Sequence, residues 1–218
     1  MSHLKSILFL SVIALGVILL GTLTDIILRI TLDGLLSDGN SELKLLILRG
    51  LEILVLTLLM TTRGWPQLKL RAISLDLGIG TFLVLGGWGT SALVDFLLES
   101  SGAPPLFAPF KAHAEATWAF LILAILVGPL LEELFFRAGL YIACSPKNLL
   151  EKSWVLVLSS LLFASLHLNW TLEFTTQLPL FVVWTCCGVA TMALYTLRRS
   201  LLPGYFLHGG ANAVLFFL

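Results

Sequence analysis

The sequence contains few charged residues. They make up 12% of its 218 residues, about half the share of roughly 25% that is typical of soluble domains. Its thirteen basic and thirteen acidic residues also cancel, so no net field attracts nucleic acid. These scarcities exclude a disordered protein, a nucleic-acid-binding protein and an ordinary soluble domain. Cysteine is scarce too: Cys144, Cys186 and Cys187 are too few for a disulfide framework, and we interpret them as small apolar packing residues.

Long hydrophobic runs dominate the sequence, and hydrophobic residues make up 58% of it. A helix that crosses a bilayer needs about 20 apolar residues, and seven runs come close to this length or exceed it. They lie at 7–30, 43–62, 75–98, 115–142, 153–170, 177–197 and 201–218. The first is too long for the apolar region of a signal peptide, so we expect an uncleaved span. The pattern predicts an all-α fold: a polytopic transmembrane helical bundle of about seven spans, with a polar intramembrane cavity.

Basic residues are divided unequally between the two sides of such a bundle. Those that share one side are Lys5, Arg63, Lys69, Arg71, Lys147, Lys152, Arg198 and Arg199. The positive-inside rule therefore predicts a cytoplasmic N-terminus for this multi-pass integral membrane protein, and an external C-terminus. The last run contains Pro203, Gly209 and Gly210, which leaves open a half-buried or kinked helix in place of a regular crossing.

Several charged residues outside the fourth run need no functional explanation. Asp25 and Asp76 lie near the ends of runs and can reach the headgroup region, where a charge costs far less than at the bilayer centre. Arg49 and Glu52 stand at i,i+3 spacing near the start of the second run, and we interpret them as a packing pair.

The fourth run carries two adjacent acids at a depth where charge is expensive. Glu132 and Glu133 lie about ten residues, or ~15 Å, from the cytoplasmic end of the predicted helix. A charge at that depth costs about 2.5–3.5 kcal/mol. Glu133 and Arg137 are four residues apart and can neutralise each other. Glu132 points about 100° away around the helix, so it must face a cavity, bind a partner or be protonated.

Two later runs offer partners for Glu132. Phe163 and His167 are four residues apart and share a helical face, and so do His208 and Asn212 in the last run. Such groups can serve only to form structural hydrogen bonds between helices. A layer with two carboxylates, an arginine, two histidines and an amide on three helices is more typical of a functional site.

The residue types favour hydrolysis. A carboxylate beside a neutral imidazole can take a proton from water and so create a nucleophile, a role that fits Glu132 with His167. His208 and Asn212 can donate hydrogen bonds to a developing oxyanion. Ser165 stands two residues before His167 and is expected to face away from the cluster. This favours attack by water over a covalent acyl-enzyme.

The motifs Glu132-Glu133-x-x-x-Arg137, Phe163-x-x-x-His167 and His208-x-x-x-Asn212, in this order, resemble those of the CPBP family of intramembrane proteases. This family includes Rce1-like CAAX prenyl endopeptidases and the Abi proteins. The resemblance implies an N-terminal region of about three spans at 1–110 and a CPBP/Abi-like catalytic core of about four spans at 111–218. It implies a membrane-anchored or prenylated peptide as substrate. Its catalytic roles fall on Glu132 and His167 for water activation and on His208 and Asn212 for the oxyanion hole. By the same resemblance, Glu133 and Arg137 support Glu132.

Three questions stay open at this point. A Glu/His/His set can hold a divalent metal such as zinc, and we favour the metal-free reading because an asparagine stands where a stronger ligand would be needed. A non-enzymatic membrane partner, such as a bacteriocin immunity factor or an assembly chaperone, would retain the same motifs. A transporter that relays protons through Glu132 is less favoured, because the sequence contains no inverted repeat.

Overall fold

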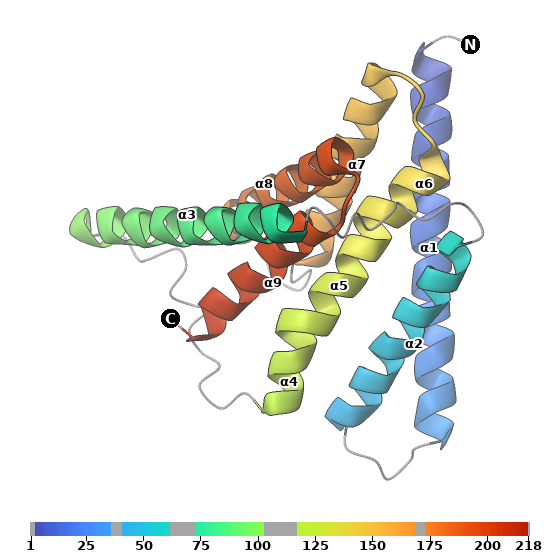
Figure 1. Ribbon diagram of the computed structural model, residues 1–218, viewed down its shortest axis with the longest axis horizontal. Coiled ribbons are helices and arrows are strands. Elements are labelled where there is room, and N and C mark those ends of the chain that lie inside the picture. The colour runs from blue at the N-terminus through green and yellow to red at the C-terminus, as the bar shows by residue number, and fades with distance from the viewer. Residues whose placement is uncertain (1–2, 36–40, 62–72, 103–116, 169–172, 218) are drawn as a thin grey trace.

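The computed structural model describes residues 3–35, 41–61, 73–102, 117–168 and 173–217, and every regular element in these ranges is helical (Figure 1). This confirms the predicted all-α fold. The elements are α1 (His3–Leu35), α2 (Ser41–Thr61), α3 (Ile73–Ser100), α4 (Trp118–Ile122), η3 (Leu123–Val127), α5 (Gly128–Glu133), η4 (Leu134–Gly139), α6 (Leu140–Cys144), α7 (Leu149–Leu166), α8 (Phe174–Arg198) and α9 (Leu202–Phe217). The predicted runs differ from these helices by only a few residues at most ends.

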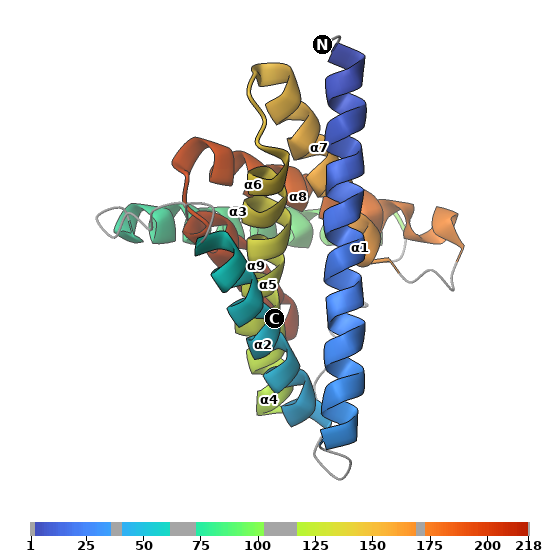
Figure 2. The ribbon, with the colours of Figure 1, turned by 90° about the vertical axis from the view of Figure 1, so that its right-hand side faces the viewer.

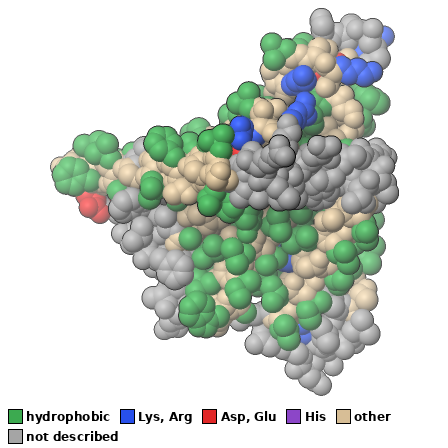
Figure 3. Space-filling view, in the orientation of Figure 1, with side chains coloured by type: hydrophobic (Ala, Val, Ile, Leu, Met, Phe, Trp, Pro, Cys, Tyr) green, Lys and Arg blue, Asp and Glu red, His purple; other side chains and the backbone are tan. Residues whose placement is uncertain are grey.

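The molecule presents an apolar surface. Four helical stretches among the described residues are long and apolar enough to cross a membrane: Lys5–Thr31, Trp118–Cys144, Leu149–Leu166 and Leu180–Arg198. Large hydrophobic side chains on α1 and α3 point outward, among them Leu19 and Phe82, which are 70% and 74% exposed. Figure 3 shows hydrophobic side chains spread over the described part of the visible face. These features are those of an integral membrane protein.

The helices do not all run in one direction. α1 and α2 lie side by side, whereas α3 lies across the direction of α1 in both views (Figures 1 and 2). α1 and α3 therefore cannot both follow the membrane normal. The predicted count of about seven spans stays a prediction for this reason.

The fourth run forms one long helix that changes its winding twice. η3 and η4 are π-helical turns on either side of α5. Pro129 is the second residue of α5, and a proline has no backbone N–H to donate. In an α-helix, the N–H at position 129 would donate to the carbonyl of Ile125, four residues earlier, and in a π-helix to that of Ala124, five residues earlier. Pro129 leaves that carbonyl without its usual donor. The missing backbone N–H of Pro129 therefore accounts for the irregular winding.

α9 packs against α3, α8, η3 and α5. A methyl group at Gly209 would lie 2.5 Å from the carbonyl oxygen of Ile125, so glycine lets the two backbones meet at one of the carbonyls that Pro129 affects. Pro203 is the second residue of α9 and so begins the helix without interrupting it. α9 is one continuous helix of 16 residues, so the kink considered for the last run is not seen, while the half-buried alternative stays a prediction.

Candidate active site

The two adjacent acids end α5 and differ in environment. Glu133 is buried, with a side chain that is 1% exposed, whereas that of Glu132 is 32% exposed. Consecutive residues of a helix point about 100° apart, which explains how one acid faces the interior of the bundle while the other stays accessible. Glu132 is therefore the more accessible of the two carboxylates, with its Oε2 atom buried.

Glu132 lies between the two predicted histidines. Its Oε2 is 3.5 Å from Nε2 of His167 and 3.8 Å from Nε2 of His208. His167 is the C-cap of α7 and is 21% exposed, whereas His208 belongs to α9 and is buried. Three helices that are remote in sequence therefore bring these three side chains together, as the sequence predicted.

Each imidazole has its other ring nitrogen turned toward an acceptor. Nδ1 of His167 lies 2.9 Å from the carbonyl oxygen of Phe163. Because a carbonyl only accepts hydrogen bonds, this contact assigns the proton of neutral His167 to Nδ1 and leaves a lone pair on Nε2. Nδ1 of His208 lies 3.5 Å from Oε1 of Glu133. Both Nε2 atoms thus face Glu132.

Arg137 holds the buried side of the cluster. It pairs with Glu133 at 3.3 Å, which confirms the pair predicted from the i,i+4 spacing. Its Nε donates to Thr191 on α8 at 2.7 Å, and its Nη1 donates to Ser159 on α7 at 3.4 Å. The guanidinium also lies 4.5 Å from the centre of the Phe163 ring. One side chain therefore links the helix of both acids to α7 and α8.

Asn212 sits one turn beyond His208 on α9, and its amide has a defined partner. Nδ2 donates to the carbonyl oxygen of Ala124 in η3 at 2.7 Å. This carbonyl is the one that Pro129 leaves unpaired in a π-helical turn, because the N–H of Gly128 donates to Leu123 instead. The amide satisfies a backbone acceptor and so sets the position of α9 along η3.

The motifs did not reveal three residues of the site: Ser159, Trp184 and Thr191. The Trp184 ring stacks on His167, with centroids 4.2 Å apart and an angle of 28° between the planes. Trp184, Gly188, Thr191 and Tyr195 follow one another at spacings of four, three and four on α8. This spacing is that of one helical face, and it was a signal that could have identified α8 as the fourth helix of the site.

The cluster has more buried polar atoms than hydrogen bonds. Among the described residues, those without a hydrogen-bond partner are Oε2 of Glu132, both carboxylate oxygens of Glu133, Nη2 of Arg137 and Nδ1 of His208. Buried polar atoms are nearly always paired. Most of these atoms lie within 3.3–3.8 Å of an oppositely charged or titratable group without forming a hydrogen bond. Such a loosely paired buried cluster indicates a site that binds a further group or transfers protons.

A divalent cation is one group that fits. Glu132, His167 and His208 each offer a ligand atom, and the three atoms lie within 4.8 Å of one another. Two histidines and a glutamate are a known ligand set of catalytic zinc. The acceptors beside the two Nδ1 atoms are of the kind that orients metal-binding histidines. The residues fit a metal by donor type and orientation.

Comparison with known proteins agrees with the predicted resemblance. Residues 114–214 match the family model described as type II CAAX prenyl endopeptidase Rce1-like. The matched stretch is just under half of the chain and contains all six predicted site residues. The comparison with curated proteins gave no significant match, and neither did the comparison with solved structures. Residues 114–214 are therefore similar to the Rce1-like family of type II CAAX prenyl endopeptidases.

Proposed function

We propose that the protein is an intramembrane endopeptidase that hydrolyses a peptide bond in a membrane-anchored or prenylated peptide. The observation that carries the proposal is the convergence of Glu132 with the Nε2 atoms of His167 and His208, inside a stretch that matches an endopeptidase family. An accessible carboxylate beside an imidazole lone pair is a suitable base for water.

In the proposed reaction, Glu132 and His167 take a proton from a water molecule. The water oxygen attacks the carbonyl carbon of the scissile bond and forms a tetrahedral intermediate with a negatively charged oxygen. The proton then passes to the amide nitrogen as the C–N bond breaks, which leaves a free carboxyl and a free amine. The exposed fractions of Glu132 and His167, 32% and 21%, allow both to meet water and substrate.

His208 and Asn212 are the proposed oxyanion donors. Nε2 of His208 donates when it carries a proton, and Nδ1 of the same ring faces Oε1 of Glu133 at 3.5 Å, which orients the imidazole. Asn212 uses one amide N–H for the carbonyl of Ala124, and its second N–H is available to the oxyanion. Glu133 and Arg137 act in this proposal by holding His208, in addition to the expected support of Glu132.

A metal-dependent form of the same hydrolysis is the alternative. Glu132, His167 and His208 would hold the ion, and a bound zinc would supply a Lewis acid that polarises the scissile carbonyl. We favour the metal-free form and expect cleavage to survive a zinc chelator. Loss of cleavage with the chelator, and its return on adding zinc, would establish the metal-dependent form.

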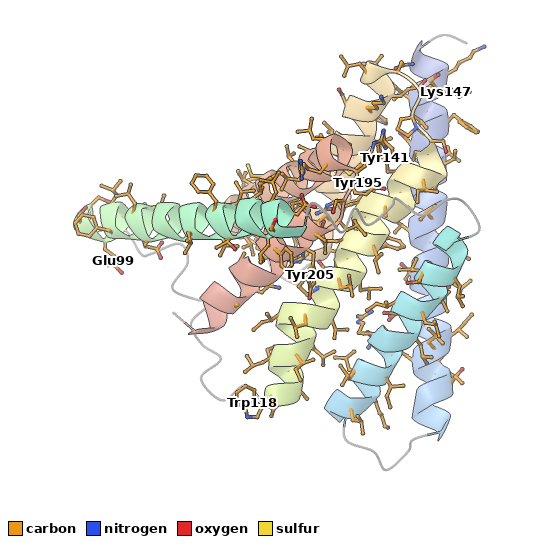
Figure 4. All side chains as sticks on the ribbon, in the orientation of Figure 1. Glu99, Trp118, Tyr141, Lys147, Tyr195 and Tyr205 are labelled. Carbon is orange, nitrogen blue, oxygen red and sulfur yellow. The ribbon has the colours of Figure 1, made fainter. Side chains whose placement is uncertain are left out.

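The proposal includes the arrangement in the membrane. Residues 111–218 form the catalytic core and 1–110 the N-terminal region, with the N-terminus in the cytoplasm. Lys and Arg side chains gather at the end of the bundle where the N-terminus lies (Figure 3), and Lys147 is at this end (Figure 4). The positive-inside rule supports this orientation.

Peptide cleavage by the purified protein in lipid tests the proposal. A mixed pool of prenylated, otherwise lipidated and hydrophobic peptides is incubated with wild type, Glu132→Ala and Glu99→Gln, and products are identified by mass spectrometry. Glu99 is an exposed acid on α3, far along the chain from the site, and provides the matched control. We expect a product from wild type and Glu99→Gln and none from Glu132→Ala. Absence of any product from folded wild type would reject the protease and favour the non-enzymatic membrane partner.

A further inference from the structure

His167 is weakly held by its own helix. α7 ends at Leu166, and His167 is its C-cap, with φ −90° and ψ 0°. Among the described residues, the ring makes one hydrogen bond, from Nδ1 to the carbonyl of Phe163, and its Nε2 lies 3.5 Å from Glu132. A base that must meet both water and Glu132 needs further support.

Trp184 supplies contact from another helix. Its indole stacks on His167 at 4.2 Å, while Phe163 covers the ring from a second direction at 4.5 Å. The same indole meets His208 edge-on, with centroids 6.2 Å apart. Trp184 is therefore a single side chain in contact range of both histidines, one on α7 and the other on α9.

The backbone position of Trp184 on α8 is itself fixed. Gly188 lies one turn further along the same face of α8, and an added methyl group there would come within 2.9 Å of Ser160 on α7. Thr191 lies two turns further along and accepts a hydrogen bond from Arg137. α8 is thus tightly joined to α7 and to the helix of the two acids. A rigid indole on a fixed helix can define where a neighbouring ring lies.

We propose that Trp184 is a positioning residue that orients the imidazole of His167 and sets its distance from His208. The catalytic consequence rests on the proposed function, whereas the geometric role does not. In this proposal Trp184 acts through the two histidines, and its loss should lower the turnover rate while leaving the substrate affinity largely unchanged.

The test compares Trp184→Leu, Trp184→Phe and Trp154→Leu. Trp154 is the matched control because it is a partly buried tryptophan on α7 that donates to Ser11 of α1, away from the site. Proteins with ¹³C-labelled histidine are studied by NMR in detergent, with signals assigned through single His→Gln variants. Kinetics are measured on the peptide that wild type cleaves.

The stacked indole should shift the ring-proton signals of His167 upfield in wild type. We expect Trp184→Leu to remove this shift and to lower kcat about ten- to a hundredfold, with KM within about twofold. Trp184→Phe, which keeps a ring face, should restore most of both, and Trp154→Leu should change neither.

Two results would overturn the proposal: a His167 signal or a kcat that is unchanged in folded Trp184→Leu, or an equal loss of kcat in Trp154→Leu. Should Trp184→Leu not fold, an intermediate shift and kcat in Trp184→Phe support the role, and wild-type values reject it. If wild type cleaves no peptide, the proposed function fails, and the NMR comparison still decides the position of His167.

Discussion

Two groups of charged residues lie among the apolar helices, and they differ in how well their members are paired. Between α1 and α2, Arg29 lies 2.8 Å from Asp25, while Arg49 lies 3.2 Å from Asp25 and 2.6 Å from Glu52. The predicted Arg49–Glu52 pair is confirmed there, within a balanced set of two acids and two bases. In the candidate site, two carboxylates face one guanidinium and two histidines, at distances of 3.3 to 3.8 Å.

The difference separates a structural cluster from a functional one. In the α1–α2 cluster every charged side chain contacts one of opposite charge. These charges therefore hold the two helices together and leave little for a ligand. The site cluster keeps buried polar atoms that make no hydrogen bond, and such atoms are typical of a place where another group or a proton completes the set. Pairing geometry, more than the presence of charge, identifies the site.

The largest expected effect comes from Arg137→Met. This change leaves Glu133 buried without its cation, and breaking a buried pair from one side costs about 3–5 kcal/mol. We expect a matching loss in the free energy of unfolding, measured by denaturation in detergent, together with loss of cleavage. A loss below about 1 kcal/mol would mean that Glu133 is neutral in the folded protein.

A double variant sharpens this result. Arg137→Met with Glu133→Gln removes both charges, and replacing a whole buried ion pair is often nearly neutral. We expect the double variant to recover much of the unfolding free energy but not the cleavage, because His208 still lacks its carboxylate neighbour. Recovery of both would contradict the proposed role of Glu133.

A smaller effect is expected from Gly204→Ala on α9. The added methyl group would lie 2.7 Å from Oε2 of Glu133 and 3.3 Å from Cβ of Thr191, and overpacking of this kind costs about 1–3 kcal/mol. Gly16→Ala on α1 is the control, since nothing lies within 4 Å of its added methyl. The midpoint temperature of its thermal denaturation should be at least as high as that of wild type. Equal behaviour of the two variants would mean that α9 is not closely packed at Glu133.

The smallest effect is expected from Arg29→Met in the α1–α2 cluster. The Arg29 side chain is 47% exposed and Asp25 keeps Arg49 as a partner, so we expect a loss of about 0–1 kcal/mol, as for accessible ion pairs. Cleavage should stay within about twofold of wild type in the peptide assay. A loss of activity as large as that of Arg137→Met would remove the distinction between the two clusters.

Local features of the fold and site could be predicted from the sequence. Helix positions followed from apolar runs, and the contacts of Glu133 with Arg137 and of Phe163 with His167 followed from i,i+4 spacing, because helical geometry alone brings such residues together. The direction of α3 was not predictable in this way. It depends on packing against α9, a helix more than one hundred residues away.

The contacts of the remaining site residues could not be predicted for the same physical reason. Thr191 and Arg137 are 54 residues apart, and Ser159 and Arg137 are 22 apart, so their contacts depend on how separate helices dock. Trp184 stacks on His167 across two helices, and an apolar run rich in aromatic residues gives no sign of which ring will do so. The ring contact between Tyr141 and Tyr195 likewise joins two helices that are far apart in the sequence (Figure 4).

The carbonyl of Ala124, which accepts from Asn212, also bears on how the protein is made. α9 follows α5 and α7 along the chain, so the helix with both acids is synthesised and inserted while this acceptor still lacks its amide. His208 reaches Glu132 only when α9 arrives and Asn212 finds that carbonyl. Until then, a nascent chain in the membrane holds an incomplete cluster. Docking of α9 therefore completes the fold and the candidate site in one step.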